Sequence, residues 1–247
     1  MRNLVKYDLY RAFHQVSTYI LLSLTLVIAL ISAAETTFFS EEPVEDLVST
    51  FGNALANGRS IMMMLAGCMC GLLIGEDFAI GSYGLGVSSG YHRWKLLGGR
   101  TISCFIVISL MLLEYMLISI AFSMIYVKTF VFAEVIRLAA LSILHIVLFC
   151  VGNMICILIC FVLKKKVSTT AVCLFLNVIL SSLFGFLCTK VELLTPLYLK
   201  SAPVIMYSMF GGSESVFTVL VSSLISLIIT AAVFYATGKI FEKEELV

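Results

Sequence analysis

Long runs of residues without a charged side chain restrict most strongly how this chain can fold. Residues 16–34, 60–75, 167–189 and 215–238 carry no charge, and only Glu114 interrupts residues 101–127. A helix needs about 20 apolar residues to cross the hydrocarbon core of a bilayer. The 61% hydrophobic and 13% charged content is also atypical of soluble domains. The sequence therefore predicts an all-α membrane protein with six transmembrane helices in one domain, residues 1–247. The predicted spans are about 16–36, 54–75, 101–127, 138–163, 167–189 and 215–238.

Lysines and arginines between these spans predict the orientation of the chain. Eleven of the 16 fall on the side that holds both termini and residues 76–100, and five fall on the other side. Short cytoplasmic loops are enriched in these residues, so both termini are expected in the cytoplasm. The apolar run at residues 16–34 exceeds the 7–15 residues usual in a signal peptide. We expect it to be retained as a span.

Residues 2–16 have the pattern of an amphipathic helix. Such a helix is expected to lie in the inner membrane interface, with its basic residues Lys6 and Arg11 near anionic headgroups. Its apolar face is predicted from helical spacing to consist of Val5, Leu9, Ala12, Phe13 and Val16.

Three glycines four residues apart, Gly67, Gly71 and Gly75, mark one face of the second predicted span. Glycines at this spacing let another helix backbone approach closely. They predict tight packing, either against a helix of the same chain or against a second copy.

Residues 76–100 form a polar connection much longer than the few residues that join neighbouring helices. It begins with acids, ends with bases and is rich in Gly and Ser. We interpret it as a docking surface for a soluble partner. Residues 86–90 match the G-x-S-x-G pattern, but that nucleophile needs a strand before it and an α/β sheet around it. No catalytic residue is expected.

A span here ends in Glu-Asp-Phe-x-x-Gly-Ser, and Ser-x-Gly-x-x-Arg follows. This pattern resembles the cytoplasmic loop of ABC-2-type permeases, the membrane subunits of a class of ABC transporters. In that family the loop forms a coupling helix that sits in a cleft of the ATP-binding subunit. Arg100 departs from the family pattern, in which Lys more often follows a few residues later. The resemblance implies ATPase coupling through Glu76, Asp77, Phe78, Gly81, Ser82, Ser88, Gly90 and Arg93.

The chain contains no G-x-x-x-x-G-K-[ST] motif, so it is not expected to be an enzyme by itself. A separate ABC ATPase subunit would bind ATP and Mg, and this chain would hold no cofactor or metal and bind no nucleic acid. The resemblance implies a dimeric permease in a bacterial plasma membrane, a homodimer being favoured over a heterodimer. It implies export of a hydrophobic or amphipathic substrate, with a peptide favoured over a drug or lipid. Residues 190–214 are apolar but interrupted by prolines, and are expected to form short external helices.

Four polar side chains inside the predicted spans are candidates to line a substrate path. Charged groups at bilayer depth are costly and usually face the protein interior, although polar side chains there also form simple hydrogen bonds between helices. Two alternatives stay open: a proton-coupled carrier or channel that uses the acid and the histidine, and a non-transporting membrane sensor or scaffold. The candidates are Glu114, His145, Asn153 and Asn177.

Overall fold

The computed structural model describes residues 2–39, 47–127, 132–190 and 216–243, although some side chains within these ranges, including that of Asn177, are not described. The predicted external segment, residues 190–214, lies almost wholly outside the described residues. The described residues form helices joined by short connections and contain no strand, in agreement with the predicted all-α class.

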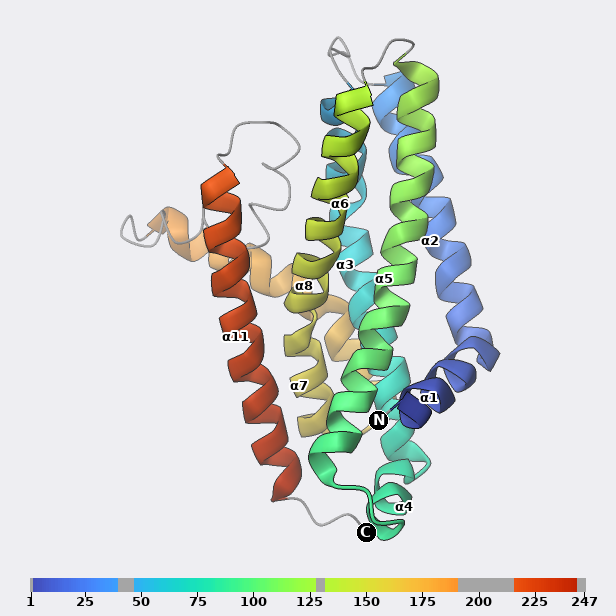
Figure 1. Cartoon of the computed structure of the whole chain (residues 1–247), viewed down its shortest axis with the longest axis vertical. Helices are drawn as coiled ribbons and strands as arrows, with labels where there is room; N and C mark the ends of the chain where they lie inside the picture. Colours follow the sequence, from blue (N-terminus) through green and yellow to red (C-terminus); the bar gives the residue numbers. More distant parts are fainter. Residues whose placement is uncertain (1, 40–46, 128–131, 191–215, 244–247) are drawn as a thin grey trace.

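The helices assemble into one elongated bundle (Figure 1). Helix α4 lies at one end, which we call the hairpin end, and α1 and the last turns of α11 lie near it. The elements in chain order are α1 (Arg2–His14), α2 (Val16–Ala34), the π-helical η1 (Glu35–Phe39), α3 (Leu47–Ala79), α4 (Ser82–Ser88), α5 (Arg93–Tyr126), α6 (Phe132–Gly152), α7 (Met154–Leu163), α8 (Lys166–Lys190) and α11 (Val216–Glu242).

Five helical segments among the described residues are long and apolar enough to cross a membrane: α2 with η1, α3, α5, α6 with α7, and α11. The chain is therefore a multi-pass helical membrane protein. The predicted span 167–189 lies in α8, of which only Lys166–Leu176 qualifies as a shorter apolar helix. Helix α7 ends near the hairpin end, α8 leads away from that end, and α11 runs toward it (Figure 1).

Helix α1 lies across the bundle beside α5, at an angle to α2 (Figure 1). Gln15 has extended backbone angles (φ −87°, ψ 129°), so the helix stops at His14 and a new helix begins at Val16. The predicted apolar face is consequently wrong at one end, since Val16 belongs to α2 and is 73% exposed. The most deeply buried side chains of α1 are Asp8 and Ala12.

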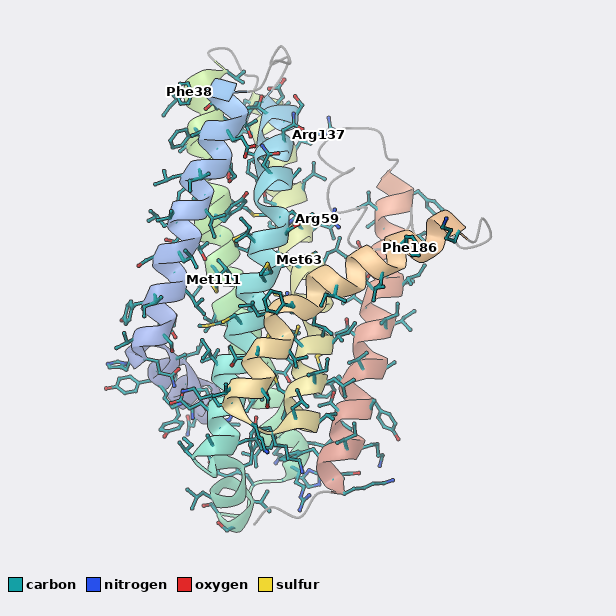
Figure 2. The ribbon with its side chains drawn as sticks, turned by 180° about the vertical axis from the view of Figure 1, so that it is seen from behind. Phe38, Arg59, Met63, Met111, Arg137 and Phe186 are labelled. Atoms are coloured by element: carbon teal, nitrogen blue, oxygen red, sulfur yellow. The ribbon has the colours of Figure 1, made fainter. Side chains whose placement is uncertain are left out.

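Gly67, Gly71 and Gly75 of α3 face α8, and these two helices form the most extensive packing in the described bundle. A Cβ atom added at Gly71 would lie 2.6 Å from Cα of Thr170, and one at Gly75 would lie 2.9 Å from Cα of Lys166. At Gly67 it would collide with the backbone carbonyl of Cys173. This glycine face (Gly67, Gly71, Gly75) is thus occupied within the chain. Farther along α8, Phe186 lies away from α3 (Figure 2).

One tyrosine of α5, Tyr115, contacts both α2 and α3. The Tyr115 hydroxyl lies 2.9 Å from Oγ of Ser32 and donates a 2.7 Å hydrogen bond to the carbonyl oxygen of Ala54. Its ring fits against Gly58, where any Cβ atom would collide with it. Because the tyrosine is 1% exposed, these contacts replace the water that its hydroxyl would otherwise bind.

Candidate functional site

The connection between α3 and α5 folds back on itself as a helical hairpin, which we define as residues 79–92. Gly81 has φ +68° and lets the chain turn sharply into the short helix α4. Gly90 has φ +86° and ends that helix. Its N–H donates to the carbonyl of Val87 at 3.0 Å, and the N–H of Tyr91 donates to that of Gly86 at 3.1 Å. This pair of bonds is the Schellman motif, in which glycine is favoured.

The tip of the hairpin exposes apolar side chains. Leu85 is 67% exposed, Ile80 is 55% exposed and Tyr91 is 43% exposed. The G-x-S-x-G match lies at the end of a short helix, where the Ser88 hydroxyl donates to the carbonyl of Leu85 at 3.0 Å. The local context is therefore not that of a hydrolase nucleophile. We call Ile80, Leu85 and Tyr91 the apolar tip.

Behind the tip, four charged side chains form a buried ionic cluster, which we define as Asp8, Arg11, Asp77 and Arg100. Arg11 pairs with Asp77, and Arg100 pairs with Asp8 and, at 3.0 Å, with Asp77. Arg100, Asp8 and Asp77 are each at most 5% exposed at the side chain. With two charges of each sign, the cluster is neutral overall. It joins α1, α3 and α5.

Hydroxyl groups complete the cluster. Ser82 donates to Oδ1 of Asp77 at 3.1 Å and lies 3.3 Å from a guanidinium nitrogen of Arg100, while Ser103 donates to Asp8 at 3.5 Å. The pKa of the Arg11 guanidinium is raised above its ordinary value. Burial alone lowers that pKa, but the hydrogen bond and negative charge of Asp77 outweigh this effect. Arg11 thus remains charged at physiological pH.

The cavity inside the cluster is too small to be a substrate site. Its volume is about 10 Å³, and its lining includes Asp8, Arg11, Asp77 and Ser103. This is about the space that one water molecule needs. Removing one member of a buried ion pair typically costs about 3–5 kcal/mol because its partner is left uncompensated. The cluster therefore holds α1, α3 and α5 together.

A group of aromatic rings packs around Tyr83 of the hairpin helix α4. Tyr83 of α4 is 1% exposed. Its ring centroid lies 4.5 Å from that of Phe78, 5.4 Å from that of Phe161 and 5.3 Å from that of Phe241. These rings come from α3, α7 and α11. Offset and edge-on aromatic pairs add to the energy of apolar burial, so α4 is fixed to three spans through one side chain.

Side chains at the start of α5 also form hydrogen bonds with the end of α11. Arg93 donates to the backbone carbonyl of Phe241 at 2.6 Å and to that of Glu242 at 3.0 Å. The indole N–H of Trp94 donates to the Glu242 carboxylate at 2.6 Å. A cation near a helix C-terminus complements the helix dipole as well as the free carbonyls. Arg93 therefore ties the hairpin to the last helix.

The predicted coupling residues divide into two groups in the structure. Gly81, Ser88 and Gly90 are exposed on the hairpin. The others face inward or toward neighbouring helices. Asp77 belongs to the ionic cluster, and Ser82 donates a hydrogen bond to it. Phe78 packs in the aromatic group, and Arg93 binds the end of α11. Glu76 pairs with Lys166 of α8 at 3.2 Å.

Sequence reasoning missed several residues of this site. The pattern of residues 2–16 places Arg11 in an interfacial helix and indicates neither a partner for it inside the protein nor a role for Asp8, while Arg100 stands out only as a departure from a family pattern. From the sequence, Lys166 is only one of the eleven basic residues that predict the cytoplasmic side. The sequence alone does not single out the apolar tip, because the same stretch contains other apolar residues, such as Tyr83 and Val87, that are not part of it.

The candidates inside the spans do not form one site among the described side chains. The His145 side chain is buried and its ring stacks on Phe149 at 6.3 Å. Oε2 of Glu114 is buried without a hydrogen-bond partner in the described part of the chain, and no described hydrogen bond joins it to His145. Asn153 is buried and donates to the Phe149 carbonyl at 2.9 Å, where α6 gives way to α7. The Asn177 side chain lies outside the described part.

Comparisons with known proteins add no identification. No protein-family model matches this sequence, and no curated protein matches it at a significant level. Within the described residues, no group of three or more His, Cys, Asp or Glu side chains is arranged to hold a metal ion. Inference about function therefore depends on the hairpin and its connections.

Proposed function

We propose that this chain is the transmembrane permease subunit of an ATP-driven ABC exporter, with a separate ATPase subunit docked on the hairpin. The observation that carries the proposal is the combination of an exposed apolar tip with a deeply anchored base. Exposed apolar side chains on a polar surface are typical of protein interaction sites. Leu85, Ile80 and Tyr91 would enter a groove of the ATPase subunit.

The base of the hairpin explains how such a partner would move the membrane helices. The ionic cluster connects α1 to the ends of α3 and α5 that flank the hairpin, and Glu76 in the same part of α3 pairs with Lys166 of α8. Tyr83 connects the hairpin to α7, and Arg93 at the start of α5 connects its base to α11. A displacement of the tip by ATP-driven closure of the partner would reach all of these helices. Closely packed elements transmit such movements because they shift as units.

The proposed transporter contains two membrane subunits, with the substrate path between them. A homodimer is favoured, and both termini lie in the cytoplasm of a bacterial cell. The ATPase subunit would bind ATP and Mg, which is consistent with the absence of a Walker A motif from this sequence. The cargo is hydrophobic or amphipathic, with a peptide favoured over a drug or lipid. This choice of cargo comes from the family resemblance.

One observation favours the alternative of a proton-coupled carrier. Oε2 of Glu114 is buried without a hydrogen-bond partner among the described residues, and a carboxyl group in this setting can exchange a proton with a transported ligand. A carrier of this kind would transport without any ATPase. Transport by the chain alone in proteoliposomes that carry a pH gradient, without ATP, distinguishes it from the exporter.

Affinity purification of the tagged chain from its native membranes tests the exporter proposal. We expect an ATPase with a Walker A motif to copurify and the complex to hydrolyse ATP. Leu85→Glu should release the ATPase, because it places a charge at the centre of the apolar tip. The matched control is Leu163→Glu, which changes an exposed leucine at the end of α7 and should retain it. Equal ATPase recovery with both variants, or no ATPase with the wild type, would contradict the proposal.

A further inference from the structure

The exposed side of α1 has a chemistry that the proposed function does not use. Four exposed residues spaced four apart, Arg2, Lys6, Tyr10 and His14, form one continuous ridge along this helix. Residues at this spacing lie above one another on a helix. Tyr10 is 64% exposed, and its ring lies 3.9 Å from that of His14. We call these four residues the basic ridge.

The basic ridge lies opposite the buried ionic cluster. Leu4, Asp8 and Ala12 follow the same four-residue spacing but are displaced by two positions from the ridge. Two positions correspond to about 200° of rotation, which is the opposite side of the helix. Asp8 and Ala12 are buried there against the bundle. The only acid of α1, Asp8, therefore points inward, and the exposed residues of the helix are basic or aromatic apart from the neutral Asn3.

The position of α1 makes a membrane surface the natural partner of this ridge. The helix ends at His14, and the apolar span α2 begins two residues later, so α1 lies where the bilayer begins. Tyr7 of α1 and Tyr19 near the start of α2 are 59% and 56% exposed. Tyrosines favour the headgroup level, because their rings prefer an apolar setting and their hydroxyls prefer water. Lysine and arginine are attracted to anionic headgroups in the same layer.

We infer that the basic ridge binds the headgroups of anionic phospholipids and that this binding stabilises the hairpin. The link to the hairpin is the cluster on the opposite side of the same helix, where Arg11 pairs with Asp77 and Asp8 pairs with Arg100. When α1 is bound to the bundle, Asp8 and Arg11 form ion pairs at the base of the hairpin. When α1 detaches, both ion pairs are lost. This inference does not depend on the identity of the docking partner.

Native mass spectrometry of the full chain, with mixed phosphatidylglycerol and phosphatidylcholine, tests the binding. The variant Arg2→Gln/Lys6→Gln should lower phosphatidylglycerol affinity by about 25-fold, since each basic residue near an anionic surface contributes about fivefold. The control Lys95→Gln/Arg137→Gln removes two exposed basic side chains outside α1 and should retain most of the affinity. Excess inorganic phosphate should not displace the lipid. Displacement by phosphate, or equal losses in both variants, would overturn the assignment to lipid at this ridge.

Hydrogen exchange in nanodiscs tests the link to the hairpin. Phosphatidylglycerol should slow amide exchange in residues 79–92 of the wild type relative to phosphatidylcholine, and this protection should disappear in the Arg2→Gln/Lys6→Gln variant. Circular dichroism verifies that the variant is folded. Lipid binding that leaves hairpin exchange unchanged in the wild type would overturn the proposed stabilisation of the hairpin.

Discussion

Replacing the glycines of α3 with alanine gives a quantitative test of how the bundle is packed. At Gly71 the new Cβ atom would lie 2.6 Å from Cα of Thr170, whereas ordinary contacts begin at 3.4 Å. Helix α8 would have to move by at least 3.4 − 2.6 = 0.8 Å, because the obstructing atom belongs to its backbone. At Gly75 the same subtraction, 3.4 − 2.9, gives 0.5 Å. The displacement is largest at Gly67, which faces the Cys173 carbonyl.

Overpacking of this kind typically costs about 1–3 kcal/mol. At about 2–4 °C per kcal/mol for a chain of this size, the melting temperature should fall by roughly 2–12 °C. The order of the losses should be Gly67→Ala, then Gly71→Ala, then Gly75→Ala. Thermal melting in detergent, followed by size-exclusion chromatography, measures it.

Gly84→Ala is the matched control for this series. No atom outside its own helix lies within 4 Å of the Cβ position at Gly84, and alanine favours a helix over glycine by up to about 1 kcal/mol. We expect this variant to melt at or slightly above the wild-type temperature. If Gly67→Ala and Gly71→Ala also melt at or above it, the close packing of α3 against α8 is wrong.

Three further predictions concern the charges and hydroxyls of the bundle. Arg100→Met should destabilise the chain by about 3–5 kcal/mol, since it leaves Asp8 without its partner, and adding Asp8→Asn should recover part of the loss; no recovery in the double variant would refute the proposed pairing. Tyr115→Phe removes the hydroxyl that bonds Ala54 and should cost about 1 kcal/mol. Its neighbour Glu114 has a buried oxygen without a described hydrogen-bond partner, so Glu114→Gln should melt at or above the wild type. A larger loss for Glu114→Gln than for Tyr115→Phe would contradict this comparison.

The sequence predicts those features that depend on neighbouring residues. Spans follow from uncharged runs, and the spacing of Gly67, Gly71 and Gly75 predicts a close approach on one face of α3. The Gly-rich connection predicts turns, which the structure places at Gly81 and Gly90. These patterns lie within a few residues of one another, so no knowledge of the tertiary arrangement is needed to read them.

The sequence could not predict the connections between distant segments. Arg11 and Asp77 are separated by 77 − 11 = 66 positions, and their pairing depends on the angle at which α1 crosses the bundle. That angle depends on the interruption of the helix at Gln15, and no proline or glycine nearby in the sequence indicates this interruption. Arg93 likewise reaches α11 only because the two helix ends meet in space. For the same reason, the sequence could not show whether Glu114 and His145, the acid and the histidine of the carrier alternative, lie together.

The most direct measurement of the central claim is photo-crosslinking in living cells from a photoreactive amino acid placed at Leu85. This position is the most exposed of the apolar tip. The proposed function predicts a crosslink to a cytoplasmic protein with a Walker A motif, with Leu163 as the position that gives none. Crosslinks at Leu85 to lipid alone, or to an extracellular protein, would contradict the proposal that an ATPase docks on the hairpin.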